Sequence, residues 1–327
     1  MARHRVVVRD RGFDYLSHAL ALQTHQLVQL ARDLVHGGVV LFRPEDEFGA
    51  VPRFERVRDA RFREQGRDRR AGRFRGAFKA VFHQGACSDT TASDGRYVMD
   101  TNYAYSCVLL EFCLAEGAPF IYASSAATYG ASTEFREEPA CEGPLNLYGY
   151  SKLLFDQRVR QLSPSAAQVV GLRYFNVFGP RQDPSGAYAA VIPCWTAAMI
   201  RGEDVIINGD GETSRDFCFV ANAVQANILA ALAPEEARGE VYNIAVGDRT
   251  SLNELFNILR EALRKMQINY DRAPIYKDFR AGDVRHSWAD IGKAKGNLGY
   301  APAHRVKDGV EIAMPWYADF FRAKSYR

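Results

Sequence analysis

The feature that most constrains the fold is a regular alternation of apolar and amphipathic segments between residues 80 and 174. Three short apolar segments are typical of buried strands, at Ala80–His83, Phe120–Ser125 and Val170–Tyr174. The stretches Asp94–Ala115 and Tyr148–Gln161 between them carry apolar residues at helical spacing. Strand, helix and strand at this spacing form βαβ units. The sequence therefore predicts an α/β fold with a doubly wound, mostly parallel sheet.

Shorter elements are predicted beyond Gly179. Apolar runs and helical periodicity indicate helices near 190–201, at 221–233 and at 251–265, and strands at 205–208 and 241–245. This looser pattern indicates a second, smaller domain in the C-terminal half.

The first 76 residues differ in composition from the rest of the chain. They contain sixteen arginines, ten acidic residues and no lysine, with weak patterns for a strand at His4–Val8, a helix at Tyr15–Val35 and a strand at Gly38–Phe42. Arg53–Arg75 holds ten of the arginines and four interleaved acids. It is either a basic arm for nucleic acid or a solvated segment. The interleaved acids favour the second interpretation, so no nucleic-acid partner is expected.

Composition excludes several other classes of protein. The chain is 47% hydrophobic and 25% charged with a formal net charge of +3, which is ordinary for a globular protein. No run of about 18 apolar residues and no signal-peptide core is present, so we expect a cytoplasmic protein without a membrane partner. The cysteines show neither a CxxC pair nor metal-ligand spacing, so we expect no metal site and reduced thiols at Cys87, Cys107, Cys113, Cys141, Cys194 and Cys218.

The most informative spacing is Tyr148-Gly-Tyr-Ser-Lys152. Residues four apart share one face of a helix, so the Tyr148 hydroxyl and the Lys152 ammonium can approach one site. A nearby cation favours the phenolate, and we therefore expect the pKa of Tyr148 to lie below its ordinary value of about 10. Ser125 ends a predicted strand, at the edge where open α/β sheets carry their active sites. Together the three side chains predict proton exchange with a substrate hydroxyl.

Three motifs around these residues carry a family resemblance: Phe82-His-Gln-Gly-Ala-Cys-Ser88, Tyr122-Ala-Ser-Ser-Ala-Ala-Thr-Tyr-Gly130 and Pro144-Leu-Asn-Leu-Tyr-Gly-Tyr-Ser-Lys152. With them, residues 80–178 resemble the extended short-chain dehydrogenase/reductases, and among these the ADP-glycero-manno-heptose 6-epimerases. The resemblance implies a catalytic triad of Ser125, Tyr148 and Lys152. It also implies a bound NAD, with NADP as the alternative, lined by Gln84, Gly85, Ala86, Asn102, Tyr148, Lys152 and Val177.

Other motifs carry a second resemblance: Asn208-Gly-Asp-Gly-Glu-Thr-Ser-Arg-Asp-Phe217, Tyr242-Asn-Ile-Ala245 and Phe279-Arg-Ala-Gly-Asp-Val-Arg-His-Ser287. With them, residues 178–320 are similar to the UDP-N-acetylglucosamine 4-epimerases of bacterial polysaccharide biosynthesis. In that group the matching arginines hold a diphosphate, which suits the guanidinium fork, and the matching acid binds the uridine ribose. The implied substrate-binding residues are Asn176, Val191, Trp195, Asn208, Arg215, Arg280 and Asp283.

The resemblance also implies a domain organisation. Residues 1–177 correspond to a Rossmann-like NAD(P)-binding domain, atypical over residues 1–76 and completed by a segment near 218–248. Residues 178–327 correspond to a smaller nucleotide-sugar-binding domain. Relatives pair through a four-helix bundle, so we expect a homodimer that uses the helix at Asp94–Ala115 and the Tyr148 helix.

One position separates the candidate reactions. Heptose 6-epimerases use a lysine as second base, and the aligned residue here is Ser185, which cannot serve as that base. Epimerisation at C4 of a UDP-N-acetylhexosamine through a 4-keto intermediate is therefore favoured, with ADP-heptose 6-epimerisation as the alternative. Dehydratases carry an acid beside the catalytic serine, whereas Ala126 and Ala127 follow Ser125 here. Dehydration is not expected.

The glycine-rich turn that relatives use for the pyrophosphate is missing from its expected place. The segment from Val6 to Leu16 keeps only Gly12-Phe13 of the pattern, and Asp10 and Asp14 would repel a pyrophosphate. Drift of this segment, a frameshifted reading of the gene, and unconventional cofactor binding are three competing explanations. They leave open a further alternative, a catalytically inactive homologue with impaired cofactor binding.

Overall fold

The computed structural model describes residues 39–42, 54–57, 80–162, 168–182, 190–279 and 284–325. The strand predicted at His4–Val8 and the helix predicted at Tyr15–Val35 lie outside these ranges. The strand predicted at Gly38–Phe42 is present over Val39–Phe42. Inside the arginine-rich stretch, Phe54–Val57 forms a further strand.

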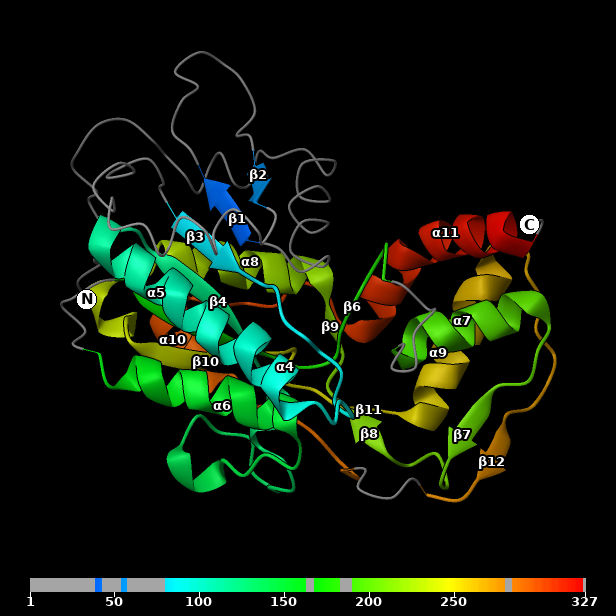
Figure 1. The fold of residues 1–327 in the computed structure, drawn as a ribbon. Coiled ribbons are helices and arrows are strands. Elements are labelled where there is room, and N and C mark those ends of the chain that lie inside the picture. The colour runs from blue at the N-terminus through cyan, green and yellow to red at the C-terminus, as the bar shows by residue number, and fades with distance from the viewer. Residues whose placement is uncertain are drawn as a thin grey trace, which may run out of the picture.

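A six-stranded sheet forms the centre of the larger unit, in the order β10-β5-β4-β3-β1-β2 (Figure 1). Its strands are β1 (Val39–Phe42), β2 (Phe54–Val57), β3 (Ala80–His83), β4 (Phe120–Ser125), β5 (Val169–Tyr174) and β10 (Glu240–Ile244). The four strands β10, β5, β4 and β3 run parallel, whereas β1 pairs antiparallel with both β3 and β2. The predicted doubly wound, mostly parallel sheet is confirmed.

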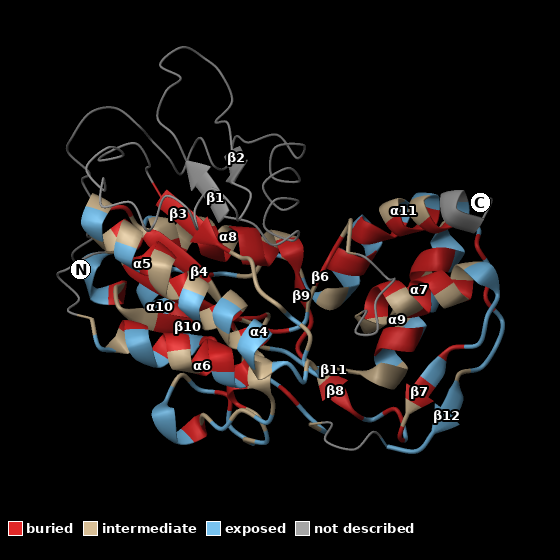
Figure 2. Cartoon of the chain, viewed as in Figure 1, coloured by how far each residue is buried: buried red, intermediate tan, exposed pale blue. Residues whose placement is uncertain are grey.

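Helices cover both faces of this sheet because successive strand residues point to opposite faces. Val81 and Phe120 pack with α5 (Tyr105–Glu116) and α6 (Leu147–Arg160) on one face. Phe82 and Ile121 belong to the core on the other face, with α8 (Val220–Ala231) and α10 (Gly292–Leu298). Both faces are lined by buried residues (Figure 2), and each large apolar side chain so buried stabilises the fold by roughly 1.5–3 kcal/mol.

The smaller unit has a hydrophobic core of its own, built mainly from three helices. These are α7 (Val191–Arg201), α9 (Leu252–Lys265) and α11 (Val306–Ser325), which pack on one another (Figure 1). The Ser251 hydroxyl accepts from the Glu254 N–H while the Glu254 carboxylate accepts from the Ser251 N–H. This capping box fixes the start of α9.

Three short pairs of strands lie outside the six-stranded sheet. They are β6 (Val177–Phe178) with β9 (Cys218–Phe219), β7 (Ile206–Asn208) with β12 (Ile275–Lys277), and β8 (Ser214–Arg215) with β11 (Thr250–Ser251). The chain thus leaves the sheet after β5, builds part of the smaller unit, and returns through α8 to add β10 beside β5. The domain boundary near residue 178 stays a prediction.

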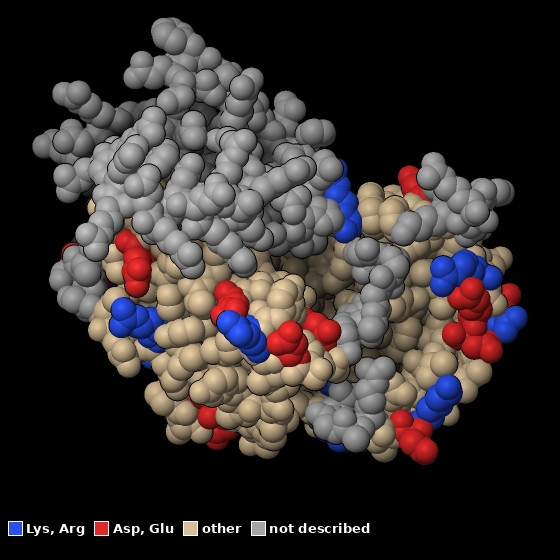
Figure 3. All heavy atoms as spheres, in the orientation of Figure 1, with Lys and Arg blue, Asp and Glu red and all other residues tan. Residues whose placement is uncertain are grey.

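Charged side chains of the described residues are mixed in sign on the face drawn in Figure 3, where basic groups lie beside acidic ones. Exposed ion pairs of the described residues include Arg272–Asp204 and Lys265–Glu311. No helix in the described part of the chain is long and apolar enough to cross a bilayer.

Candidate active site

Ser125 and Tyr148 meet at the carboxyl edge of the parallel strands. Ser125 is the last residue of β4 and lies opposite Tyr174, the last residue of β5. Tyr148 lies in the first turn of α6, and its phenol lies close enough to the Ser125 hydroxyl for that hydroxyl to act on its pKa. The Ser125 oxygen also accepts from the N–H of Ala127 at 3.1 Å. The hydroxyl is therefore held in one orientation at the sheet edge.

The start of α6 is pressed against the chain that follows Ser125. Asn146 caps the helix, because its side-chain oxygen accepts from the N–H of Gly149 at 2.8 Å. A Cβ atom on Gly149 would lie 2.5 Å from the carbonyl oxygen of Ala127, so only glycine permits this approach. The close contact brings Tyr148, the residue just before Gly149, down onto the end of β4.

Lys152 lies one helical turn after Tyr148 and is 5% exposed. Its ammonium donates a 2.8 Å hydrogen bond to the carbonyl of Ala123, two residues before Ser125. Burial lowers the pKa of Lys152 to about 8, while the carboxylate of Asp156 acts in the opposite direction. Tyr148 and Lys152 of α6 thus both contact the last three residues of β4.

The pKa of Tyr148 differs from the sequence-based expectation. Burial of the phenol raises the pKa above its ordinary value, and the nearby Cys87 thiol acts in the same direction. Interaction with the Ser125 hydroxyl is the contribution that lowers the pKa. The expectation that the lysine lowers this pKa was therefore wrong for the structure as it stands, because the cost of burying a phenolate dominates and the ammonium is directed to the Ala123 carbonyl.

The loop after β3 is fastened at both ends. At one end the Gln84 amide donates to the Asn227 side chain of α8 at 3.0 Å, and Asn227 in turn donates to the hydroxyl of Tyr174 at 2.6 Å. At the other end Cys87 is held by Asn102. Gly85 and Ala86 lie partly exposed between the two anchors, at the same sheet edge as the triad. A backbone held this way suits close approach of a dinucleotide.

Asn102 is buried in a π-helical turn, Asp100–Ala104, that joins α4 (Gly95–Met99) to α5. Its side-chain oxygen accepts from the N–H of Cys87 at 2.7 Å, and its amide donates to the Cys87 carbonyl and to the hydroxyl of Ser151, both at 3.0 Å. Ser151 belongs to α6. Asn102 therefore joins the loop after β3 to α6. Single π-helical turns inside α-helices are frequent at functional sites.

The predicted substrate-binding residues are distributed over the smaller unit and its connections. Asn176 has a φ of 32° and donates to the carbonyl of Asp216 at 3.1 Å, and Val177 after it begins β6. Val191 begins α7. Trp195, one turn later, is 8% exposed and packs in the core of the smaller unit, where its described contacts are apolar.

Two further predicted substrate residues lie in short strands. Asn208 ends β7, opposite Lys277 of β12. Arg215 lies in β8, and its guanidinium donates to the carbonyls of Ser214 at 2.9 Å and Arg285 at 3.3 Å. The predicted residues Arg280 and Asp283, and Ser185 and the Gly12 turn, lie outside the described residues.

Two residues that shape the site were not identified from the sequence. Gly149 stands inside the Tyr148–Lys152 motif, and a glycine in the first turn of a helix was the available signal of a close backbone approach. Asp156 follows Lys152 by one turn, at the spacing that puts both on one helix face. In the described part of the chain no group of His, Cys, Asp and Glu side chains is arranged to hold a metal ion.

Comparisons with known proteins identify the family of the chain. The family model described as NAD dependent epimerase/dehydratase family matches residues 14–245. Among solved structures, the UDP-glucose 4-epimerase of Thermotoga maritima, crystallised with UDP-glucose, is 33% identical, with a TM-score of 0.68 over 78% of this chain and 82% of that one.

Two other epimerases are similarly close. The UDP-N-acetylglucosamine 4-epimerase of Methanobrevibacter ruminantium, in complex with UDP-N-acetylmuramic acid, is 30% identical with a TM-score of 0.69 over 78% of this chain and 81% of that one. The ADP-L-glycero-D-manno-heptose-6-epimerase of Helicobacter pylori is 31% identical with a TM-score of 0.67 over 80% and 76%. The predicted resemblance is confirmed: the chain belongs to the NAD-dependent epimerase/dehydratase family and has the fold of its nucleotide-sugar epimerases.

Proposed function

We propose that the protein is a nucleotide-sugar epimerase that inverts C4 of a UDP-N-acetylhexosamine, interconverting UDP-GlcNAc and UDP-GalNAc through a 4-keto intermediate. The observation that carries an epimerase function is that Ser125 and Tyr148 lie together at the sheet edge, with Lys152 one turn along the same helix and bonded to the Ala123 carbonyl. A hydroxyl and a phenol that lie this close together can both hydrogen bond to the same sugar oxygen.

The residues around this point suit a dinucleotide. NAD, when bound, supplies the reversible two-electron oxidation of the sugar carbon. We assign its contacts to Gln84, Gly85 and Ala86 of the fastened loop, to Val177, and to Lys152. The Lys152 ammonium has three donors, of which the Ala123 carbonyl accepts one bond. Asn102 acts here by holding Cys87.

In the proposed reaction Tyr148 acts as the phenolate: its own proton first leaves to solvent, and the phenolate then takes the proton of the sugar 4-hydroxyl and later returns it. Ser125 donates to the same oxygen, which steadies it while C4 is a ketone. Lys152 keeps positive charge close to the end of β4, where the phenolate forms. The keto sugar presents its other face before Tyr148 gives the proton back, and inversion at C4 results.

The choice of a UDP-N-acetylhexosamine rests on the smaller unit. Arg215 lies against the backbone of Arg285, so it is close in space to the chain that follows Arg280 and Asp283. We propose that Arg215 and Arg280 bind the diphosphate and that Asp283 binds the ribose. Asn176, Val191, Trp195 and Asn208 complete the proposed sugar site. Two of the three solved relatives named above are UDP-sugar 4-epimerases.

The test is a direct assay of the purified chain with NAD. UDP-GlcNAc, UDP-glucose and ADP-heptose are supplied separately, and the sugar proton signals are followed by NMR. We expect UDP-GalNAc to accumulate from UDP-GlcNAc, and Tyr148→Phe to reduce the rate by about 10²–10⁴-fold. Tyr150→Phe is the matched control, since this tyrosine lies on the same helix but is 51% exposed.

Other outcomes identify the alternatives. Turnover of ADP-heptose alone would assign the 6-epimerase activity of the Helicobacter pylori relative to this chain instead. No turnover, together with no stabilisation of the protein by NAD or NADH in a thermal-shift experiment, would identify an inactive homologue. Stabilisation by NADP in place of NAD would reassign the cofactor.

We also propose a homodimer formed through α5 and α6. Three large side chains beside this face are exposed, Tyr97 at 57%, Leu145 at 61% and Tyr150 at 51%. They lie on α4, just before α6, and on α6 respectively. A monomeric mass in light scattering at micromolar concentration would contradict the proposal.

A further inference from the structure

Asp156 lies directly beneath the catalytic residues and is fully buried. It follows Lys152 by four residues on α6. One carboxylate oxygen accepts from the Tyr122 hydroxyl at 3.0 Å, and the other accepts from the Ser124 hydroxyl at 2.8 Å. Ser124 is the residue before Ser125. A single side chain thus joins the strand end that carries Ser125 to the helical turn that carries Lys152.

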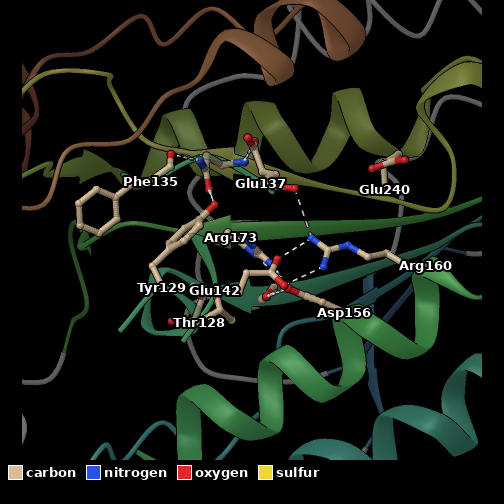
Figure 4. A network of polar contacts seen from close by, with 12 residues as sticks. Thr128, Tyr129, Phe135, Glu137, Glu142, Asp156, Arg160, Arg173 and Glu240 are labelled. Atoms are coloured by element: carbon tan, nitrogen blue, oxygen red, sulfur yellow. Dashed lines mark hydrogen bonds and ion pairs between the residues drawn. The ribbon is translucent and has the colours of Figure 1, made fainter. Parts of the chain in front are cut away.

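Arg173 of β5 also holds this carboxylate (Figure 4). The Arg173 guanidinium donates through Nε at 2.9 Å and Nη2 at 2.8 Å to the oxygen of Asp156 that also accepts from Ser124. Arg173 is itself fully buried. Its guanidinium also forms an ion pair with the carboxylate of Glu142, at 2.5 Å. The carboxylate therefore accepts four hydrogen bonds and has little freedom to turn.

The remaining members of the cluster lie farther from the site. Arg160 contacts both Glu142 oxygens, at 2.6 and 2.8 Å, and its side chain is 21% exposed. Two carboxylates and two guanidiniums make the cluster neutral as a whole. Burial opposes ionisation of Glu142, but the two arginines hold its pKa below its usual value. Arg160 and Glu142 therefore stabilise the cluster without touching β4 or the Lys152 turn.

Lys152 has few charged neighbours among the described residues. His83 of β3 faces it, and burial together with the Lys152 charge lowers the pKa of His83 to about 3, so this imidazole is neutral. Tyr148 of α6 carries a raised pKa and is also neutral. Asp156 is the nearby group whose charge favours the ammonium form of Lys152.

We propose that Asp156 is a positioning residue of the catalytic site, which locks the Ser125 end of β4 to the Lys152 turn of α6 and supplies the counter-charge of Lys152. It touches neither substrate nor cofactor. The catalytic consequence rests on the proposed function, because it requires Ser125 and Lys152 to act on a sugar. The effect on Lys152 itself does not depend on turnover.

The experiment measures the titration of Lys152 separately from activity. The full chain is treated with a small amine-acylating reagent over a pH series, and modification of Lys152 is quantified by peptide mass spectrometry. In Asp156→Asn we expect the midpoint of labelling to fall by about one pH unit relative to the unaltered protein. In the same variant kcat for epimerisation should fall at least tenfold while KM changes less than threefold.

Arg160→Gln is the matched control, because it weakens the same cluster at its outer end. It should lower the melting temperature and leave the Lys152 midpoint within a few tenths of a pH unit. Equal shifts in both variants would show a merely structural role and overturn the proposal, as would a folded Asp156→Asn protein with an unshifted midpoint. If the unaltered protein turns over no nucleotide sugar while Asp156→Asn still shifts the midpoint, the proposed function fails and the positioning role stands.

Ser124→Ala covers the case in which Asp156→Asn does not fold. It removes one of the two hydrogen bonds between Asp156 and β4, that of Ser124, and leaves the Tyr122 bond and the carboxylate in place. The proposal then expects kcat to fall about tenfold with an unshifted Lys152 midpoint and an unchanged stabilisation by NAD. An unchanged kcat would contradict it.

Discussion

The start of α6 leaves no room for a side chain at Gly149. We expect Gly149→Ala to displace Tyr148 from Ser125, because the new methyl group would meet the Ala127 carbonyl at 2.5 Å. A displacement near 1 Å lowers epimerase turnover by about 10²-fold, and the overpacking costs about 1–3 kcal/mol of stability. Steady-state kinetics and urea unfolding check both. Gly143→Ala is the control, since nothing lies within 4 Å of a Cβ atom there.

Lys152 is required for the proposed activity, but burying its ammonium lowers the free energy of unfolding. Burial lowers its pKa from 10.5 to about 8, so between these values the unfolded chain binds the proton and the native state releases it. The stability of the protein should therefore rise as pH increases from about 8 to 10.5. Lys152→Met removes this dependence. At pH 7 the variant should be more stable by up to about 3 kcal/mol and inactive.

Denaturant unfolding at pH 7 and pH 10 measures the effect. The difference in unfolding free energy between Lys152→Met and the unaltered protein should shrink at the higher pH. A difference that is the same at both pH values would show that the buried ammonium carries no such penalty.

At the scale of elements, the π-helical turn between α4 and α5 decides which side chain enters the site. Asn102→Ala would leave the Cys87 N–H without its 2.7 Å acceptor and the Ser151 hydroxyl without its donor. We expect a loss of about 1–3 kcal/mol and weaker binding of NAD, because the loop after β3 loses one of its two anchors. Calorimetric titration with NAD measures the affinity.

Thr101→Ala serves as the comparison for this prediction. Thr101 precedes Asn102 in the π-turn, and of the two the turn buries Asn102. The threonine variant should bind NAD with the affinity of the unaltered protein. Equal losses in the two variants would mean that the turn as a whole, and not the Asn102 amide, holds Cys87.

Local pattern predicted most elements, and long-range contacts explain the exceptions. The strands Ala80–His83 and Phe120–Ser125 were predicted to the residue, because a run of apolar side chains is a local signal. The helix predicted at Asp94–Ala115 has about the right extent, but its π-turn was not foreseen. The bonds that Asn102 makes reach 15 and 49 residues along the chain. Likewise, the direction of the Tyr148 pKa depends on burial, which the motif does not contain.

At the scale of the whole molecule, Asp216 holds segments of both units together. Its buried carboxylate accepts from the N–H groups of Val246 and Gly247 after β10, at 2.9 and 3.0 Å, and from that of Ala289 at 3.4 Å. Its carbonyl accepts from Asn176. Burial raises the pKa of Asp216 from 3.8 to about 6, although these hydrogen bonds act against the shift.

A raised carboxyl pKa means that the native state binds more protons than the unfolded chain between pH 3.8 and 6. The Asp216 contribution to stability is therefore greatest below this window and declines as pH rises through it, by up to about 3 kcal/mol. Asp216→Asn should lack the decline, so its cost should be larger at pH 4.5 than at pH 7. Urea unfolding at the two pH values tests this, and a cost that does not vary with pH would refute it.

The packing of α11 constrains the order in which the molecule is completed during translation. The Tyr317 hydroxyl of this helix donates to the Gly179 carbonyl at 2.8 Å, across 138 residues, and α11 also packs on α7 and α9. A nascent chain whose β3, β4, β5 and their helices have already left the ribosome still lacks α11, the third helix of its smaller unit. That unit must wait for residues 306–321 to emerge from the ribosome, and until then the apolar sides of α7 and α9 are open to chaperones.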